Sequence, residues 1–418
     1  MKKLILTFGT MLLMIASGCT SGNEPGEIIP NDRVDIVLDG ATRSAAENLK
    51  SFYVDFTTDA IGHVDSDSDI SGKNVVVSPL SASMVLAMVA NGVEGDISKE
   101  IANYLGVADV EAVNSLANIL LKELPKADNQ TDLSLANSIW VNRPYELTSE
   151  FASRMMSEYL ADLRNEDFSG DNARAVKNIN KWCSDNTGGM ITNMIEKLSP
   201  SSLALLLNTL YFKGIWKDKA FLVENTEKMS FHGAGGTKDV DMMFSYHTDR
   251  KYASDDSFDA FYLDFGNSAF SFMVVLPKET LSLTDANRLL TAAEFTKLEE
   301  EAVKCRLAVY LPRFKVETGL DVSDVLASVK LPDIKDNLSF DMFEPACEGV
   351  VLFRQSARLE IDENGAKAAS VSTGEIKITS PEIVPGETYT VKVDRPFYFF
   401  LKEKSTGACL LSGRIADL

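Results

Sequence analysis

Histidine, the side chain most often used for acid–base catalysis near neutral pH, is scarce in this sequence. The only three among 418 residues are His63, His232 and His247. None of them stands in HExxH or another metal-ligand spacing, and GxSxG, Walker and GxGxxG patterns are absent. Carboxylate pairs are too numerous for one to be singled out. We therefore predict no catalytic residues, no metal site and no cofactor, and we expect that the protein is not an enzyme.

A glycine-rich stretch, His232–Gly236, is the nearest match to a phosphate-binding loop. It lacks the GK[ST] that follows in such loops, and this composition is typical of a tight turn between strands. We predict a hairpin there.

The cysteines of the body show no CxxC spacing and no neighbouring histidine, which argues against metal ligation. They are Cys183, Cys305, Cys347 and Cys409. An exported chain could oxidise them in pairs, but their scatter favours buried free thiols.

The first 18 residues have the pattern of a signal peptide. Two lysines precede an apolar run from Leu4 to Ala16, and small residues and Cys19 follow. The run is too short to span a bilayer stably, although an anchor helix or a chance apolar start are the alternatives. The end, Ala16-Ser-Gly-Cys19, resembles a bacterial lipobox, although leucine is usual where Ala16 stands. We therefore expect a lipidated Cys19 as the new N-terminus, with several acyl chains tethering it firmly.

Residues 19–42 are expected to form a flexible tether, because Thr20–Arg33 is rich in Gly, Pro and acids without periodicity. We expect an exported protein, lipid-anchored to a bacterial outer membrane or cell surface, and otherwise extracellular or periplasmic. Without the signal, 39 basic side chains face 61 acidic ones, a formal charge of -22. Such a chain repels phosphate backbones, so nucleic acid is not an expected partner.

Hydrophobic periodicity predicts helices mainly in the first half and strands mainly in the second. Predicted helices cover 41–61, 81–92, 96–106, 109–124, 149–163 and 172–185, and predicted strands cover 74–79, 133–141, 203–214, 238–247, 259–266, 270–277 and 305–317. The continuous apolar run 203–214 predicts a central strand covered on both faces. Trp140, Trp182 and Trp216 lie in apolar patterns and are expected in the core. This order, without βα alternation, predicts one α+β domain over residues 43–418.

The stretch Glu363–Glu375, ENGAKAASVSTGE, consists largely of small residues between two predicted strands. The residues after it are too few for a separate domain, so they must pack onto what precedes them. The stretch is therefore a long loop within one domain, and such loops are usually functional or mobile.

Several blocks along the chain resemble the serpins, protease inhibitors with a reactive loop, over residues 43 to 415. The blocks are Asn74–Ser81 (NVVVSPLS), Asn180–Trp182 with Thr187–Ile191, Asn208–Trp216 (NTLYFKGIW) with Phe221, Thr226, Phe231 and Met242–Met243, Leu311–Glu317 (LPRFKVE), and Arg395–Phe399 (RPFYF). Each block is weak alone, but their order matches the family. The resemblance implies helices packed around a large central mixed sheet, with further sheets and an exposed reactive loop at about 363–392.

The resemblance places the hinge of that loop at Glu363, Gly365, Ala366, Lys367, Ala368, Ala369 and Ser370. In serpins the cleaved loop becomes a new central strand of the main sheet. Strand side chains alternate between faces. From Ala366 onward, one face carries Ala, Ala, Ser, Ser, Gly, Ile and Ile, whereas the charges Lys367, Glu375 and Lys377 all fall on the other. Ala366 and Lys367 depart from the family's usual Thr and Glu, but Lys367 lies on the expected solvent face.

The family mechanism implies a suicide substrate that traps a serine protease, and in some cases a cysteine protease, as its acyl-enzyme. The family's usual spacing from Glu363 places the reactive bond between Thr379 and Ser380. Lys377–Ile378 is the alternative for a trypsin-like protease, and Ile378–Thr379 suits an elastase- or subtilisin-like one. The loop is several residues longer than is common, so the position could shift. Pro381 and Pro385 are expected to keep its distal part off the sheet.

Two further features adjust the expectation. Gln355 stands where many serpins carry a histidine near the top of the insertion path, which argues against a pH-linked gate. The predicted helix 109–124 has Lys122 as its only basic residue, which argues against heparin-type activation. We expect a monomer whose only membrane contact is the lipid anchor. The alternative is a non-inhibitory serpin that carries a ligand or serves as a scaffold; bulky residues on the inward hinge face would favour it, and small ones are present.

Overall fold

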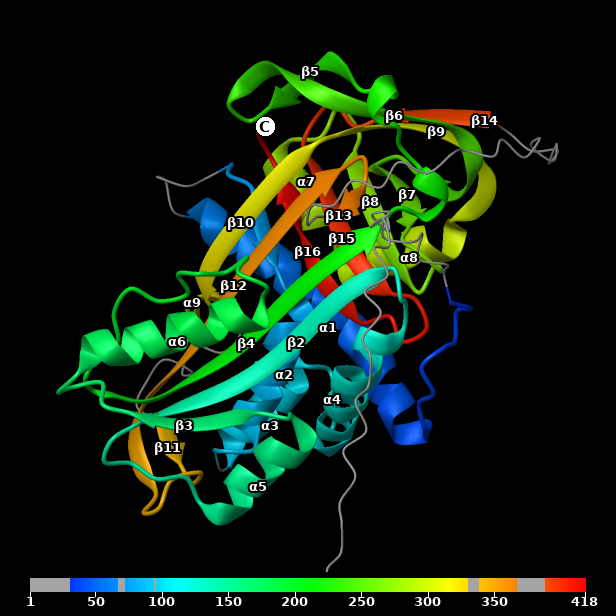
Figure 1. Cartoon of the computed structure of the whole chain (residues 1–418). Helices are drawn as coiled ribbons and strands as arrows, with labels where there is room; N and C mark the ends of the chain where they lie inside the picture. The colour runs from blue at the N-terminus through cyan, green and yellow to red at the C-terminus, as the bar shows by residue number, and fades with distance from the viewer. Residues whose placement is uncertain (1–30, 67–71, 94, 330–337, 367–387) are drawn as a thin grey trace, which may run out of the picture.

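The molecule is built on two β-sheets, and most of the helices pack against one side of the sheet that contains β12, β13 and β4 (Figure 1). The computed structural model describes residues 31–66, 72–93, 95–329, 338–366 and 388–418. One sheet, here named the hinge sheet, has the order β10-β12-β13-β4-β2-β3, with β11 paired to β12. The second sheet has the order β1-β16-β15-β8-β7-β6-β9-β14, with β5 paired to β6. This arrangement confirms the predicted α+β class.

The helices are α1 (Gly40–Ser66), α2 (Pro79–Ala90), α3 (Asp96–Tyr104), α4 (Glu111–Glu123), α5 (Ser149–Glu158), α6 (Asn172–Asn186), α7 (Leu283–Leu289), α8 (Ala292–Glu301) and α9 (Val322–Val329). Short 3₁₀ turns occupy Leu124–Lys126, Lys217–Lys219 and Val223–Asn225. Among the described helices, none combines the length and apolarity that crossing a membrane requires.

The strands are β1 (Val75–Val77), β2 (Thr131–Asn142), β3 (Asp162–Glu166), β4 (Ser202–Ile215), β5 (Glu227–Gly233), β6 (Gly236–Ser254), β7 (Phe258–Asp264), β8 (Phe270–Pro277), β9 (Val303–Pro312), β10 (Phe314–Asp321), β11 (Leu338–Phe340), β12 (Cys347–Asp362), β13 (Gly365–Ala366), β14 (Thr388–Lys392), β15 (Phe397–Glu403) and β16 (Cys409–Ile415). The turn between β5 and β6 is the hairpin predicted at His232–Gly236.

Strand β4 is the centre of the hinge sheet, as its apolar run predicts. Successive side chains of a strand point to opposite faces. Leu206 and Leu210 join the main core, whereas Leu205 and Leu207 join a smaller core shared with α6. Both faces of β4 are therefore covered, which explains why its sequence shows no polar alternation.

Helix α2 fills the space between the two sheets and is buried along its whole length. Ser78 caps its first turn by accepting a hydrogen bond from the Ser81 amide, and Pro79 begins the helix. Serine is favoured at the cap because its hydroxyl accepts a hydrogen bond from an amide of the first turn that has no partner within the helix. Proline is favoured at the first helical position because it has no N–H group that would need such a partner. The three tryptophans are buried as predicted.

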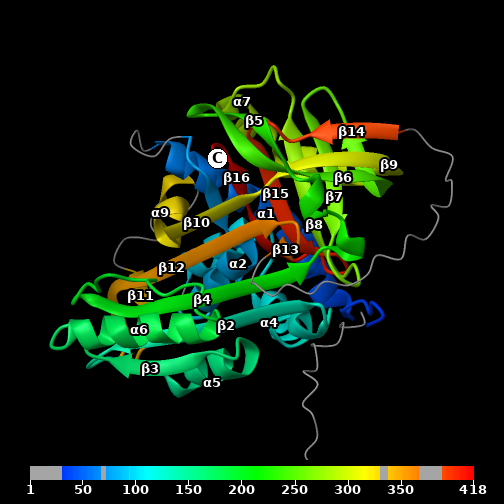
Figure 2. The ribbon, with the colours of Figure 1, turned by 45° about the horizontal axis from the view of Figure 1, so that its top comes forward.

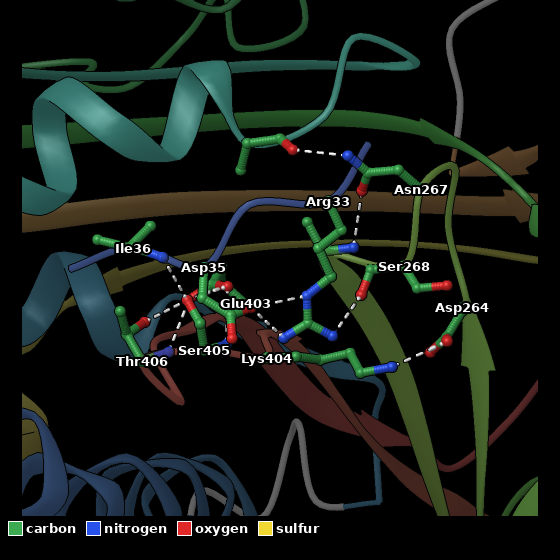
Figure 3. A network of polar contacts seen from close by, with 12 residues as sticks. Arg33, Asp35, Ile36, Asp264, Asn267, Ser268, Glu403, Lys404, Ser405 and Thr406 are labelled. Carbon is green, nitrogen blue, oxygen red and sulfur yellow. Dashed lines mark hydrogen bonds and ion pairs between the residues drawn. The ribbon is translucent and has the colours of Figure 1, made fainter. Parts of the chain in front are cut away.

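The segment 31–39 lies against the body of the protein (Figure 3). Asn31 and Asn129 exchange hydrogen bonds between main-chain amides and side-chain oxygens, and the Asn267 amide group also donates to Asn31. Arg33 donates to the Ser268 carbonyl, and the Ile36 amide donates to Ser405. The tether predicted over residues 19–42 therefore does not reach residue 42, since α1 begins at Gly40. These contacts are polar and specific, so hydrophobic periodicity could not reveal them.

Candidate functional site: the hinge and the seam

Strands β12 and β4 run in parallel but are paired along only part of their length (Figure 2). The ladder joins Val350–Arg354 to Ser202–Leu207 and stops there. Beyond it, residues 355–360 of β12 and 208–213 of β4 are described but form no pairs with each other. We name this open stretch the seam. Along the seam, β12 is paired on its outer side with β10, and β4 is paired on its outer side with β2.

The start of the predicted hinge closes the far end of the seam. Strand β13 lies between β12 and β4 and pairs with both in antiparallel fashion. Ala366 is opposite Ile361 on one side and Gly214 on the other. Ala366 is 3% exposed and belongs to the main core.

Gly365 can occupy its place only because it has no side chain. Its φ is +131°, a region that other residues rarely adopt, and a Cβ here would lie 2.0 Å from the Gly214 carbonyl oxygen. The close approach of two backbones at the mouth of the seam therefore explains the glycine of the hinge.

Trp216 holds the turn that leads into β13. Its indole Nε1 donates to the Asp362 carbonyl at 2.8 Å, and its own amide donates to the Asn364 carbonyl at 3.1 Å. The indole stacks on Phe265, with ring centroids 4.4 Å apart. Two hydrogen bonds from one rigid residue fix where the chain leaves β12.

Glu363 is anchored by charge in the same turn. Its side chain is 4% exposed, and Arg313 Nε contacts its two carboxylate oxygens at 2.8 and 2.7 Å. Thr226 donates a further hydrogen bond to the carboxylate. Burial alone would raise the pKa of Glu363, but the hydrogen bonds from Arg313 and Thr226 outweigh it and lower the pKa. The carboxylate is thus held ionised.

Gln355 lies at the inner end of the seam, halfway along β12, rather than near the top of the insertion path as expected. Its side-chain amide accepts from the Ser78 amide at 2.9 Å and donates to the Ser78 carbonyl at 2.7 Å. The pair joins β12 to the start of α2 without an ionisable group. On β4, Asn208 and Thr209 each bury an oxygen that lacks a hydrogen-bond partner. Buried polar atoms without a hydrogen-bond partner are rare in folded proteins, so these two oxygens leave this part of β4 with unused hydrogen-bonding capacity.

The other predicted site residues lie outside the described residues. These are Lys367, Ala368, Ala369, Ser370, Lys377, Ile378, Thr379 and Ser380 of the loop, and Cys19. The structure describes both ends of the loop: β13 at the seam, and β14, which pairs in parallel with β9.

Sequence reasoning misses the partners of the hinge. It identifies Arg313 only as a member of its block, and Trp216 only as a member of its block and a core residue. An arginine between Pro312 and Phe314, directly after the apolar run Leu307–Pro312, is the available signal. No local pattern could pair it with Glu363, because the two are 50 residues apart.

Elsewhere in the described residues, the groups that could do chemistry are metal-ligating side chains and cysteine thiols. No cluster of His, Cys, Asp and Glu there could hold a metal ion. Cys183, Cys347 and Cys409 are free thiols; Cys183, Cys305 and Cys409 are buried, and Cys347 is half-buried. Burial raises the pKa of the Cys183 and Cys409 thiols to about 12, which keeps them protonated and unreactive.

Comparison with known proteins agrees with this geometry. The family model described as "Serpin (serine protease inhibitor)" matches residues 53–418. A serine protease inhibitor of Cyanea capillata is 30% identical over 82% of this chain and 92% of its own length. An uncharacterized serpin-like protein of Thermococcus kodakarensis is 26% identical over 98% of this chain and 97% of its own.

Solved structures show the same fold. The thermophilic serpin tengpin in its native state has a TM-score of 0.79 and 25% identity, covering 94% of this chain and 98% of its own. Thyroxine-binding globulin in complex with thyroxine has a TM-score of 0.73 at 20% identity, covering 88% of this chain and 98% of its own. Serpins are generally inhibitors of proteases rather than catalysts, although some are not inhibitors. The family model spans most of the sequence, and the chain belongs to the serpin family.

Proposed function

We propose that this serpin inhibits serine proteases as a suicide substrate. The observation that carries the proposal is the seam: an unpaired stretch between β12 and β4 whose mouth already holds Gly365 and Ala366. Because the first residues of the loop are already seated between the two strands, a cut in the loop frees the residues that follow to enter the seam.

The register of β13 defines how far the loop can enter without breaking existing pairs. Because Ala366 is opposite Ile361 and Gly214, continuing the same register places residues 367–372 opposite 360–355 and 213–208. These are the positions of the seam. Entry of later residues requires the ladder between Val350–Arg354 and Ser202–Leu207 to open. Insertion therefore has an easy first stage and a harder second one.

The chemistry belongs to the protease. Its serine attacks the carbonyl of the reactive bond, an ester forms, and the amine of the next residue leaves. The freed hinge then inserts at about 3.3 Å per residue, so about fifteen residues carry the attached protease on the order of 50 Å. Inhibition results when insertion distorts the protease before water hydrolyses the ester. Thr379–Ser380 is the proposed bond, with Lys377–Ile378 and Ile378–Thr379 as the alternatives.

The test is the formation of a covalent complex. The mature protein is incubated with trypsin-, elastase- and subtilisin-type enzymes, and an SDS-resistant complex is sought by electrophoresis. Mass spectrometry of the released peptide locates the cut. If every protease cleaves the loop and stays active, the protein is not an inhibitor, and the carrier or scaffold function gains support.

Two neighbouring substitutions make the test specific for insertion. Ala368→Arg places bulk and charge on the inward face of the hinge and should convert the inhibitor into a substrate. Ala369→Arg, on the opposite face, is the matched control and should still form the complex. Equal behaviour of the two variants would contradict insertion in the register of β13.

We also propose that the protein is exported and held by lipid on Cys19 at the outer membrane or cell surface, and that it acts as a monomer. The support is the signal-like start and lipobox-like Ala16–Cys19. Metabolic labelling with palmitate in a bacterial host should label the wild type but not Cys19→Ser. Absence of label in the wild type would rule out the lipid anchor. The oligomeric state is tested separately, by gel filtration of the mature protein.

A further inference from the structure

The two most exposed large apolar side chains among the described residues lie three positions apart in the segment 31–39. Val34 is 73% exposed and Val37 is 84% exposed. Their neighbours turn inward: Leu38 is 7% exposed and belongs to the main core, and Ile36 packs against it. Apolar side chains scattered singly over a surface are ordinary, whereas two in one short segment call for a partner.

The backbone that carries the two valines is held in place. Arg33 donates to the Ser268 carbonyl at 3.3 Å, and the Ile36 amide donates to Ser405 Oγ at 3.0 Å (Figure 3). These contacts come from the same short segment as the valines. The valines are therefore presented to the outside by a positioned backbone.

A hollow of about 470 Å³ lies beside the two valines, between the segment 31–37 and the end of α4. Its volume is within the range of sites that hold small molecules or parts of larger ones. Apolar side chains from both sides line it, namely Val34, Ile36, Val37, Ile119 and Ala127. The exposed valines therefore continue into an apolar recess and are not isolated on the surface.

The charged side chains that line the hollow cancel one another. They are Asp35 and Glu123 on one side of the balance and Lys122 and Lys126 on the other, whereas the whole chain carries a net charge of -20. Lys122 donates to the neutral Asn118 side chain at 2.7 Å and makes no ion pair among the described residues. An anionic surface is repelled by most of this molecule, but this part of it is neutral and offers a lysine.

The sequence places the segment close to the proposed lipid anchor. Twelve peptide links separate Cys19 from Asn31. A flexible chain of twelve residues spans on the order of 20 Å on average and about 40 Å at most. A domain of this size has a radius of gyration of roughly 21 Å, so its width exceeds the average span of such a tether. A lipid on Cys19 would therefore keep the side that carries the valines toward the bilayer.

We propose that Val34, Val37, Lys122 and Lys126 form a membrane-contact face, which rests on the phospholipid bilayer that holds the anchor. The valines enter the boundary between headgroups and acyl chains, and the lysines reach the phosphates. The inference rests on the proposed lipid anchor. The anchor supplies the affinity and the face supplies the orientation, because two valines are too few to hold a protein on a membrane by themselves.

The test couples the mature chain through Cys19 to a maleimide-bearing phospholipid, so it does not depend on lipidation in a cell. The vesicles contain phosphatidylethanolamine and phosphatidylglycerol with brominated acyl chains, and Cys347→Ser removes the half-buried thiol. Val37→Trp introduces a fluorophore on the membrane-contact face. We expect the brominated chains to quench it. The native tryptophans are buried and should not respond; they are Trp140, Trp182 and Trp216.

Two controls make the quenching specific. Ala173→Trp places the fluorophore at an exposed position of α6, which lies on the opposite side of the molecule from the segment 31–39 (Figures 1 and 2). It should not be quenched. Adding Val34→Asp to the Val37→Trp chain should abolish its quenching. Adding Val223→Asp, at a valine that is 62% exposed elsewhere, should leave the quenching unchanged.

Equal quenching at positions 37 and 173 would overturn the inference, and so would quenching that survives Val34→Asp. If Val34→Asp changes the oligomeric state in gel filtration but not the quenching, the face serves a second copy of the chain and the inference is wrong. A wild type without palmitate label in cells would overturn the anchor and this inference together. A labelled wild type whose coupled Val37→Trp chain is not quenched would overturn the inference alone.

Discussion

At the scale of single residues, the hinge is defined by contacts that select one side chain each. Gly365 is required by the Gly214 carbonyl, and Glu363 by Arg313. Trp216 donates hydrogen bonds only to backbone carbonyls of the turn, so it constrains the path of the chain but not which side chains the turn carries. The contribution of each of these residues to the hinge can therefore be measured with a separate single substitution.

Replacing Glu363 with Gln should destabilise the intact protein by about 2 kcal/mol at pH 7, because a buried carboxylate with charged donors is lost. The folded-state pKa of Glu363 is lowered, so its contribution is present above the unfolded pKa of about 4.3 and is lost as pH falls through the folded value. The difference between wild type and variant in urea unfolding should thus shrink below about pH 4. Glu348→Gln, exposed on the same strand, is the control. A pH-independent difference would contradict the ionic anchor.

Replacing Gly365 with Ala should expel the hinge from the mouth of the seam, since the new Cβ would overlap the Gly214 carbonyl oxygen. We expect a melting temperature lower by roughly 2–4 °C for each 1 kcal/mol lost, measured by circular dichroism. Gly319→Ala in β10 is the control, because a Cβ at Gly319 would meet nothing within 4 Å and its φ is ordinary. Similar melting of both variants would mean that β13 contributes nothing to stability.

At the scale of elements, the segment 31–39 behaves as part of the body. It bridges the start of β2, through Asn129, to the turns that follow β7 and β15.

Helix α5 also departs from its prediction: the pattern over 149–163 predicts one helix, but α5 ends at Glu158. Leu160 has a φ of +50°, and β3 then pairs with β2. The tertiary pairing of β3 outweighs local helix propensity, as it often does near element ends.

Removing residues 31–38 from the mature chain should lower its stability by about 1–3 kcal/mol, since several hydrogen bonds of about 0.5–1.5 kcal/mol each are lost. The measurement is thermal unfolding of chains that begin at residue 31 and at residue 39. Asn31→Ala, which removes only the side-chain acceptor, should give a smaller part of the loss. Identical melting curves would show that the contacts of this segment do not contribute to the folded state.

At the scale of the whole molecule, the seam leaves the hinge sheet incomplete. Filling it adds a strand that pairs on both sides between β12 and β4, and the two strands are already paired on their outer edges. The intact fold is therefore expected to hold less stabilisation than the same chain with its loop cut and inserted.

Cleavage within the loop should consequently raise the melting temperature, by at least about 10 °C, because many ladder hydrogen bonds form at once. The measurement is circular dichroism before and after limited proteolysis, with the site confirmed by mass spectrometry. Ala368→Arg, cut at the same bond, should gain little. A cut wild type that melts no higher than the intact protein would leave insertion without a driving force.

The sequence by itself determined the concentration of helices in the first half and of strands in the second, and the central place of residues 203–214, because these follow from side-chain periodicity within short segments. Only the tertiary structure decided which groups hold the hinge. Gln355 meets Ser78 across 277 residues, Trp216 meets Asp362 across 146, and Arg313 meets Glu363 across 50. Such pairs depend on how the sheets close in space, and no local pattern of side chains encodes that closure.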